Sequence, residues 1–358
     1  MRGTEPAQQH AAARAGCWLL SLLMLCVCLS ASAVEREFYF DRIDNENGLL
    51  QNSVLSLLQA SDATVWIGTQ GALHQFDGYR FRLFEHDPDN PNSLPDSAIT
   101  ALVETLDGKI WVGTSASGVS RLDPASGRFD SFTLAAGAVD RNAREAVTSL
   151  LLDPTRGLWI GTRGGLDLLS SESNGREHFV PADLTSGIGI VRDLMLAGDG
   201  NTWIASSTGL WRILKGKDQL EQIAKSSISD AYSVFESREH VLYAGISRGL
   251  LRLDANTGAA ELVWHGEQTT TVHAIVEDKI GKLWLAVSDQ GLVILEPRSL
   301  QARWIRPDSK ISGSLPQGAV TRLMVDQSGL LWVGSDSLGL SKVDPNGATF
   351  TMVADRNP

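Results

Sequence analysis

The sequence predicts an all-β protein, a seven-bladed β-propeller made of four-stranded antiparallel blades. Three observations support this fold class. A motif centred on an aromatic residue occurs seven times within the 358 residues. Its copies follow one another at intervals of 40 to 48 residues, a period that suits four short strands per repeat. The repeats are rich in Gly, Thr, Val and Trp, and they lack the sustained 3.6-residue periodicity that a two-helix repeat would show.

Each repeat has its aromatic anchor at the start of the second strand. We expect the anchor to fill the wedge between neighbouring sheets, because one blade alone cannot bury both of its faces. A small residue two positions later lets adjacent backbones approach, and a later glycine permits a positive φ in the next turn. The fifth and sixth repeats have "AGI" and "LAV" in place of the usual Gly-Thr step, so we expect these blades to pack less regularly. The anchors are Trp66, Trp111, Trp159, Trp203, Tyr243, Trp284 and Trp332.

The third repeat shows the four expected strands most clearly. They are 146–153 ("AVTSLLLD"), 158–162 ("LWIGT"), 165–170 ("GLDLLS") and the outer strand 177–180 ("EHFV"). The segments "PTRG" and "RG" between the first three have the composition of tight turns. We call the four strands of each repeat A to D, from the axis outward, and the repeat is therefore predicted to be an antiparallel meander.

The two ends of the chain offer one outer strand too many. Eight segments have the pattern of an outer strand, whereas only seven sets of inner strands are available. Either 38–43 ("FYFDRI") or 349–353 ("TFTMV") can complete the last blade. We expect the spare strand to lead into further repeats of a longer array.

The first 33 residues are typical of a cleavable export signal. Arg2 and Arg14 precede an apolar run at 17–29, and the small residues 31–33 ("ASA") form a cleavage site. The run is too short to span a bilayer as a helix, and no other segment of the sequence is long and apolar enough. The sequence thus predicts a signal peptide at 1–33 and a periplasmic propeller domain at 34–358.

Composition excludes several classes of function. Cys17, Cys26 and Cys28 all lie in the signal, so the exported part has no disulfide, cysteine-ligated zinc or cysteine nucleophile. The formal net charge is -11, and no run of Lys and Arg offsets it, so nucleic acid is not an expected partner. The histidines and acidic residues show no metal-ligand spacing, and phosphate-binding glycine motifs are absent. We therefore expect no cofactor and no metal.

The repeat resembles that of a known family. The pattern [LI]-W-[IV]-G-T-x-x-G-[LV]-x-x-[LF]-D, preceded by D-x-x-G as in "LVETLDGKIWVGT", is similar to the two-component regulator propeller repeat. The inter-blade segments "NPNSLPDSAITALV" and "ISGSLPQGAVTRLM" resemble the family's entry into strand A. The resemblance covers the whole mature chain.

This resemblance implies a role in signalling. Propellers of the family are periplasmic sensor regions of hybrid histidine kinases and GGDEF diguanylate cyclases, and are not catalytic themselves. The output domain would then be missing from this chain or act in trans, and dimerisation through missing C-terminal regions stays open.

One sequence motif suggests a catalytic serine. Residues 245–249 match the G-x-S-x-G nucleophile elbow, but a strand rather than a helix follows them. Ser247 is therefore interpreted as a turn residue. The aspartates that recur in every repeat are interpreted as serving the blade, because a ligand site should lie where the repeats differ.

The candidate ligand site lies on one face of the propeller. The B to C turns and the D to A connections emerge on the same face, and the D to A connections vary most in length and composition. Three arginines there could hold an anionic group such as a uronate or a phosphate. Alternatively, they pair with acidic loop residues. Trp264, at the start of a D to A connection, is expected to be an exposed stacking residue. The candidate ligand-binding residues are Gln70, Arg144, Arg163, Arg248, Trp264, Asp289, Gln290 and Asp336.

Three functions remain open on the sequence. The leading hypothesis is a ligand-sensing propeller for a small molecule or an oligosaccharide. The second is an enzyme acting on polysaccharide, a lyase or glycoside hydrolase, which needs two carboxylates or a His/Tyr pair converging on the axis. The third is a periplasmic scaffold that binds other proteins. The side chains that converge at the axis can discriminate between the first two.

Overall fold

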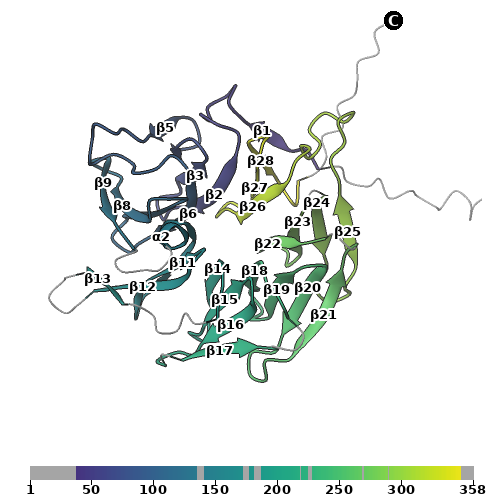
Figure 1. The fold of residues 1–358 in the computed structure, drawn as a ribbon. Helices are drawn as coiled ribbons and strands as arrows, with labels where there is room; N and C mark the ends of the chain where they lie inside the picture. Colours follow the sequence, from purple (N-terminus) through teal and green to yellow (C-terminus); the bar gives the residue numbers. More distant parts are fainter. Residues whose placement is uncertain are drawn as a thin grey trace, which may run out of the picture. The chain divides into compact units, whose positions relative to one another are not determined.

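The computed structural model describes residues 38–134, 141–171, 177–180, 187–217, 219–224, 228–267, 270–288 and 290–347. Phe38–Gly347 form one compact unit. Its described part contains seven four-stranded antiparallel sheets and one short helix, α2 (Arg141–Glu145). The predicted seven-bladed propeller is therefore confirmed (Figure 1). The predicted signal peptide at 1–33 and the segment 349–353 lie outside the described residues.

In six of the blades, four strands that are consecutive in the chain run from the axis outward. Blade 1 consists of β2 (Val54–Gln59), β3 (Val65–Thr69), β4 (Leu73–Phe76) and β5 (Phe81–Phe84). Blade 2 consists of β6 (Ile99–Glu104), β7 (Ile110–Thr114), β8 (Val119–Asp123) and β9 (Arg128–Phe132). Blade 3 consists of β10 (Val147–Asp153), β11 (Gly157–Thr162), β12 (Gly165–Ser171) and β13 (Glu177–Val180), as the sequence predicted.

The remaining blades follow the same order. Blade 4 consists of β14 (Val191–Leu196), β15 (Thr202–Ser206), β16 (Gly209–Ile213) and β17 (Leu220–Ile223). Blade 5 consists of β18 (Ser233–Glu236), β19 (Leu242–Ile246), β20 (Gly249–Leu253) and β21 (Ala260–His265). Blade 6 consists of β22 (Val272–Glu277), β23 (Leu283–Val287), β24 (Gly291–Leu295) and β25 (Ala302–Ile305). Blade 7 has β26 (Val320–Val325), β27 (Leu331–Ser335) and β28 (Leu340–Val343).

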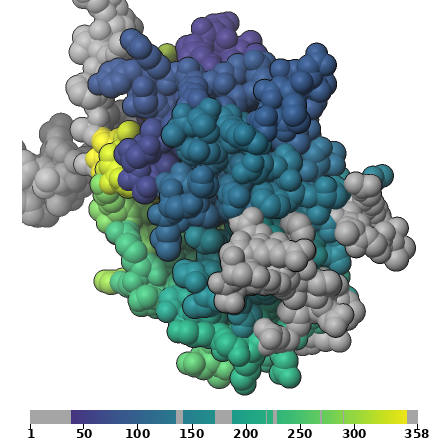
Figure 2. All heavy atoms as spheres, turned by 90° about the vertical axis from the view of Figure 1, so that its left-hand side faces the viewer, coloured from purple at the N-terminus to yellow at the C-terminus, as the bar shows by residue number. Residues whose placement is uncertain are grey.

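The N-terminal strand closes the ring. Strand β1 (Asp41–Ile43) pairs antiparallel with β28, with Asp41 opposite Lys342 and Ile43 opposite Leu340. It is the outer strand of blade 7, so 38–43 rather than 349–353 completes that blade. Figure 2 shows the yellow end of the described chain against purple N-terminal residues. Closure by strands from both ends leaves no long unpaired sheet edge inside the ring.

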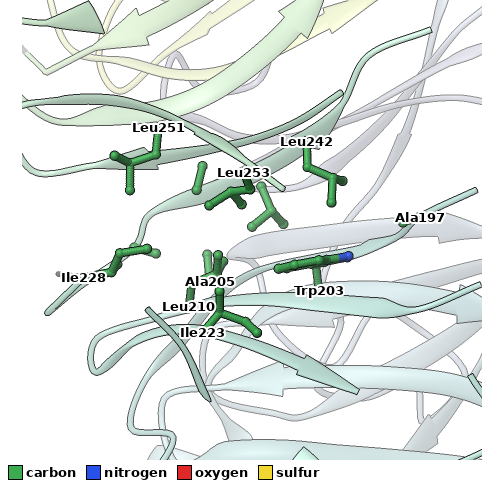
Figure 3. Packing of buried hydrophobic residues seen from close by; sticks show 12 residues of the cluster. Ala197, Trp203, Ala205, Leu210, Ile223, Ile228, Leu242, Leu251 and Leu253 are labelled. Atoms are coloured by element: carbon green, nitrogen blue, oxygen red, sulfur yellow. The ribbon is translucent and has the colours of Figure 1, made fainter. Parts of the chain in front are cut away.

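The aromatic anchors fill the wedges between blades. Trp159 and Trp203 are each only 1% exposed. Figure 3 shows Trp203 packed in an apolar cluster with Leu242 and Leu253 of the next blade. A Cβ at Gly161, two residues after its anchor, would lie 2.5 Å from Val191 Cγ1 of blade 4, so a small residue is required there. This confirms the close approach that the sequence predicted.

The last residue of strand B usually caps the turn that follows it. Thr162 Oγ1 donates to the Gly165 carbonyl at 3.0 Å and accepts from the Gly164 N–H at 3.1 Å. Blades 5 and 6 have Ile246 and Val287 in this place and lack the hydroxyl. Both blades still have four strands, although the inner strand of blade 5 has only four residues. The departures in the sequence therefore change the turns more than the sheets.

Hydrogen bonds between inner strands join neighbouring blades. Thr100 Oγ1 donates to the Val147 carbonyl at 2.7 Å, and Thr148 Oγ1 donates to the Val191 carbonyl at 2.6 Å. Thr321 Oγ1 makes the same bond, at 2.6 Å, from the last blade to the Val54 carbonyl of the first. In six of the inner strands a register shift marks this point as a β-bulge.

In these six blades the bulge residue lies eleven positions before the aromatic anchor, and we call the residue at this position the axial residue in all seven repeats. The axial residues are Leu55, Thr100, Thr148, Arg192, Tyr232, His273 and Thr321. The residue that follows each of them is called the post-axial residue. The post-axial residues are Ser56, Ala101, Ser149, Asp193, Ser233, Ala274 and Arg322.

Candidate functional site

A cavity of about 570 Å³ lies among the inner strands. Residues from all seven blades line it, most of them at the axial and post-axial positions. Ser115 and Arg163, from B to C turns, also line it, so the cavity extends to the face on which the sequence placed the ligand site. Its volume falls within the range of small-molecule binding sites.

The axial residues of blades 4, 5 and 6 form one contact chain in this cavity. The Arg192 guanidinium carbon lies 3.8 Å from the centroid of the Tyr232 ring, a cation-π contact. The Tyr232 and His273 rings meet edge to face with centroids 5.3 Å apart. His273 Nε2 lies 3.2 Å from Ser288 Oγ. Three consecutive blades thus present an arginine, a tyrosine and a histidine to the same space.

Two post-axial residues of opposite charge also line the cavity. Asp193 accepts backbone hydrogen bonds from Val234 and Leu194, each at 3.0 Å. Arg322 donates from Nη1 to the Thr321 carbonyl at 2.8 Å. Among the described residues no ion pair within 4.0 Å joins Asp193 to Arg322, so the two charges share the cavity without touching.

Burial changes the titration of both groups. It raises the pKa of Asp193 to about 6, because surrounding protein disfavours the carboxylate; the Val234 backbone bond and the Arg322 charge oppose this rise. Burial lowers the pKa of Arg322, and the charge on Asp193 opposes that change. Asp193 is therefore ionised at neutral pH and becomes protonated under mildly acidic conditions.

The charged residues make the cavity positive. Of the described residues that line it, Arg163, Arg192 and Arg322 are basic and only Asp193 is acidic. The whole chain, in contrast, has a formal net charge of -11. A positive cavity in an acidic protein concentrates anions at that place.

The three arginines predicted as a cluster have different surroundings in the fold. Arg163 is exposed on the B to C turn of blade 3 and lines the cavity. Arg144 instead forms an ion pair with Asp167, with Nη1 2.7 Å from Oδ1, and its side chain packs under the turn at Gly164. Burial raises the pKa of Asp167 while Arg144 opposes the rise. The alternative of pairing with an acidic residue therefore describes Arg144.

Arg248 lies apart from the cavity lining. It is exposed on the B to C turn of blade 5 and has a φ of 77°, in the left-handed region. Its N–H donates to the Thr270 carbonyl, and its own carbonyl accepts from Gly266 N at 3.0 Å. These two backbone bonds hold a conformation that costs energy for a residue other than glycine.

The other described turn residues of the predicted site are not part of the cavity lining. Gln70 is exposed, and its Oε1 lies 3.4 Å from Gln51 Nε2. Asp336 is also exposed and accepts from Ser337 Oγ at 2.9 Å. Gln290 is partly buried in the turn of blade 6, and Asp289 lies outside the described residues.

The prediction that Trp264 is an exposed stacking residue is wrong. Its side chain is only 8% exposed and packs against Trp304, with ring centroids 5.8 Å apart. Strand β21 continues to His265, and a register shift places Trp264 opposite the fully buried Leu250. Residues paired across strands point to the same face, so the indole is turned into the blade.

The main cavity residues lie on or directly before the inner strands, whereas most of the residues predicted from the sequence lie in turns. Arg192, Asp193, Tyr232, His273 and Arg322 all lie on strand A or directly before it. The signal was nevertheless present at a fixed distance before each anchor. At the axial position, three repeats have threonine, whereas the fourth to sixth have arginine, tyrosine and histidine.

The described residues show no other site that matches a chemistry considered for the sequence. Ser247 lies between two strands and donates from Oγ to Asp230 Oδ2 at 3.0 Å, so it is a turn residue. No group of three His, Cys, Asp or Glu side chains in the described part could hold a metal ion. No helix in that part is long and apolar enough to cross a membrane.

The fold is shared with extracellular domains of signalling proteins. The extracellular domain of a hybrid two-component system from B. thetaiotaomicron has a TM-score of 0.72 and 20% identity. This match covers 86% of this chain and 42% of that chain. The extracellular domain of a one-component system from the same organism has a TM-score of 0.70 and 20% identity. This match covers 85% of this chain and 39% of that chain. The chain thus spans about two fifths of the length of these structures. They belong to the class of protein that the repeat motif resembles.

Two other similarities extend this comparison. Virginiamycin B lyase from Staphylococcus aureus shares the fold with a TM-score of 0.65 and 13% identity, over 86% of this chain and 99% of that chain. A segment of 67 residues is 30% identical to histidine kinase P4 of Formosa agariphila, covering 19% of this chain and 5% of that protein. No family model matches the chain.

Proposed function

We propose that this protein is a periplasmic ligand-sensing propeller of a two-component or diguanylate cyclase receptor, exported by the signal peptide at 1–33. It binds a small molecule or an oligosaccharide and is not catalytic itself. The output domain belongs to another part of the receptor or to a partner. The similarity of its fold to extracellular domains of one-component and two-component systems supports this role.

The observation that carries the proposal is the concentration of unusual side chains at equivalent positions around one cavity. The blades with threonine at the axial position show that a hydroxyl is enough to join one blade to the next. Arg192, Tyr232 and His273 therefore exceed what the fold needs. Side chains that the blade does not require, gathered in a cavity of about 570 Å³, are typical of a binding site.

The ligand is proposed to carry a negative charge. Arg163 at the mouth and Arg192 inside offer guanidinium groups, which bind carboxylates and phosphates through charge-assisted hydrogen bonds. For an oligosaccharide, the turn residues around the mouth are proposed to contact the parts outside the cavity. These are Gln70, Arg248, Asp289, Gln290 and Asp336.

The experiment is a binding screen with matched variants. The secreted chain is titrated by calorimetry with acidic and neutral mono- and oligosaccharides. For a ligand that binds, Arg192→Thr should weaken affinity by about tenfold or more, the effect of losing one charge-assisted bond. Arg128→Gln, on the exposed outer strand β9, is the matched control and should change nothing. Equal affinity for wild type and Arg192→Thr would exclude the axial cavity as the site.

A second candidate function has one specific observation in its favour. Tyr232 and His273 form the His/Tyr pair that an axial lyase would need, with ring centroids 5.3 Å apart. A lyase is also among the proteins that share the fold. A β-elimination on a uronate polymer gives a conjugated product that absorbs ultraviolet light. Product formation that is lost in His273→Thr would establish the enzyme; no absorbance change with uronate polymers would favour the sensor.

A further inference from the structure

The contacts between blades do not require the charges of the two post-axial residues Asp193 and Arg322. Asp193 does join two blades, because its Oδ2 accepts from the Val234 N–H of the next blade at 3.0 Å, but serine makes such a contact without a charge. At this position the other five blades have serine or alanine, and Ser56 and Ser233 donate to the next blade's backbone. Asp193 and Arg322 replace these small residues in blades 4 and 7 and place charges inside the ring. Because a charge inside a protein is costly unless its hydrogen-bonding positions are occupied, the positions that the protein leaves open on these two residues favour a ligand that occupies them.

The hydrogen-bonding capacity of each group defines what that ligand must offer. Arg322 has five N–H donors, and one of them bonds to Thr321. Arg192 uses Nη1 for the Ala231 carbonyl at 3.0 Å and stacks on Tyr232. The two guanidinium groups therefore offer further donors, which match the two oxygens of a carboxylate.

Asp193, in contrast, needs a hydrogen-bond donor on the ligand. An ionised carboxylate has about four acceptor positions, and two backbone N–H groups of Val234 and Leu194 occupy two of them. The remaining positions accept from a hydroxyl. A ligand that satisfies both sides of the cavity thus carries a carboxylate and a hydroxyl group.

We propose that the axial cavity selects a hydroxy carboxylate, whose carboxylate binds Arg322 and Arg192 while one of its hydroxyls donates to Asp193. The inference rests on the proposed sensor function and names the ligand class of the same site. The apolar part of the cavity lining supports this ligand class, because Leu57, Leu102 and Leu323 can cover the apolar face of a sugar ring.

Asp193 is the residue that sets specificity. A phosphate group carries more negative charge than a carboxylate, so the Asp193 carboxylate repels it more strongly. A neutral sugar is not repelled, but it leaves the guanidinium groups without an anionic partner. Asp193 and the two guanidinium groups therefore disfavour both kinds of competitor.

The test compares three classes of probe with matched variants of the secreted chain. The probes are hydroxy carboxylates (lactate, gluconate, D-glucuronate and D-galacturonate), D-glucose as the neutral match and D-glucose 6-phosphate as the phosphate match. The variants are Arg322→Ser and Asp193→Ser, each of which installs the residue that three other blades have at this position. Arg128→Gln and Asp130→Ser on the outer strand β9 are controls of equal charge change. Thermal melts establish that all variants fold.

We expect at least one hydroxy carboxylate to bind wild type in preference to glucose and glucose 6-phosphate. Arg322→Ser should weaken that binding by about tenfold or more. Asp193→Ser should weaken it too, but should improve the relative affinity for glucose 6-phosphate. The control variants should bind as wild type does.

A pH series supplies a second readout. At pH 5 Asp193 is protonated, so wild type should discriminate less against glucose 6-phosphate than at pH 7.5, whereas Asp193→Ser should show no such change. The other ionisable groups that line the cavity, Arg163, Arg192, Tyr232, His273 and Arg322, are common to both proteins.

Other outcomes separate this inference from the proposed function. Glucose binding that is lost in Arg192→Thr but kept in Arg322→Ser would leave the sensor in place and overturn the hydroxy carboxylate. Equal affinities of wild type for glucuronate and glucose 6-phosphate would also overturn it. If none of these probes binds, the inference is wrong, and the wider saccharide screen decides the proposed function separately.

Discussion

The two sides of the axial ring use the same backbone position differently. In blades 2, 3 and 7 the axial residue is a threonine whose hydroxyl donates to the carbonyl of the next blade. In blades 4, 5 and 6 the axial residue is Arg192, Tyr232 or His273, and these side chains contact one another in the cavity. We call the first group the joining side and the second the polar side.

Arg192 shows that the two uses are compatible. Its guanidinium Nη1 donates to the Ala231 carbonyl at 3.0 Å, a bond between blades 4 and 5 like those of the threonines. The rest of the guanidinium lies over the Tyr232 ring. A long side chain can therefore keep the contact between blades and add a cation to the cavity. Ligand chemistry can thus change at this position without a change in blade packing.

The largest expected effect tests whether blade packing is the same on both sides. Trp159, in the joining side, and Trp203, in the polar side, are each 1% exposed. We expect Trp159→Ala and Trp203→Ala each to lower the free energy of unfolding by roughly 3 to 5 kcal/mol, the cost of truncating a large buried aromatic residue. Urea unfolding followed by circular dichroism measures both losses.

The partly buried Trp211, in strand C of blade 4, serves as the control for this comparison and should cost less. Losses that differ between Trp159 and Trp203 by more than about 2 kcal/mol would show that the two sides do not share one packing scheme.

The sequence could predict the part of the fold that repeats. The anchor, the small residue after it and the glycine turn recur because every blade has the same packing problem, so their period indicates both the strand number and the ring. Closure by 38–43 could not be chosen over 349–353, because both segments have the alternation of an outer strand. Pairing of β1 with β28 depends on which end reaches blade 7 in three dimensions.

The site was less accessible to sequence reasoning. Arg163 lies on the predicted B to C turn, a position that follows from strand order, and it lines the cavity. Arg144 has the same charge in an equally suitable place, but its partner Asp167 lies 23 residues away on strand C, so the ion pair needs the fold. Trp264 was misplaced because one register shift reverses the face to which its side chain points. The other cavity residues are visible in the sequence only when the repeats are aligned at the axial position, eleven residues before each anchor.

The second-largest expected effect is the pH dependence of stability that arises from Asp193 in the polar side. Burial raises the pKa of Asp193 in the polar side to about 6, above its ordinary value near 3.8. The folded state then holds the proton more tightly than the unfolded state, so stability falls as pH rises from about 4 to 6 and stays reduced above that. Wild type should lose roughly 3 kcal/mol relative to Asp193→Asn across this window. Unfolding free energies at pH 4 to 7 for both proteins measure it.

His74 in blade 1 is a buried group whose pKa shift has the opposite direction to that of Asp193. Its side chain is fully buried and its Nε2 accepts from Leu50 N–H at 2.9 Å, and burial lowers its pKa from 6.5 to about 4. The folded state therefore resists protonation, and stability attributable to His74 is lost as pH falls from 6.5 to 4. His74→Gln should flatten this loss. If Asp193→Asn and His74→Gln changed the pH profile in the same direction, the assignment of one of them would be wrong.

The smallest expected effect concerns a single hydrogen bond of the joining side. Thr148→Val keeps the shape of the side chain but removes the hydroxyl that donates to the Val191 carbonyl at 2.6 Å. We expect a loss of about 1 kcal/mol in the free energy of unfolding, the usual net value of one hydrogen bond. Thr148→Ser retains the donor and should lose less. Because Thr148 also lines the cavity, ligand affinity is measured in parallel. Unchanged stability in Thr148→Val, with weaker ligand binding, would mean that the threonines of the joining side serve the ligand rather than the contact between blades, and the distinction between the two sides would not hold.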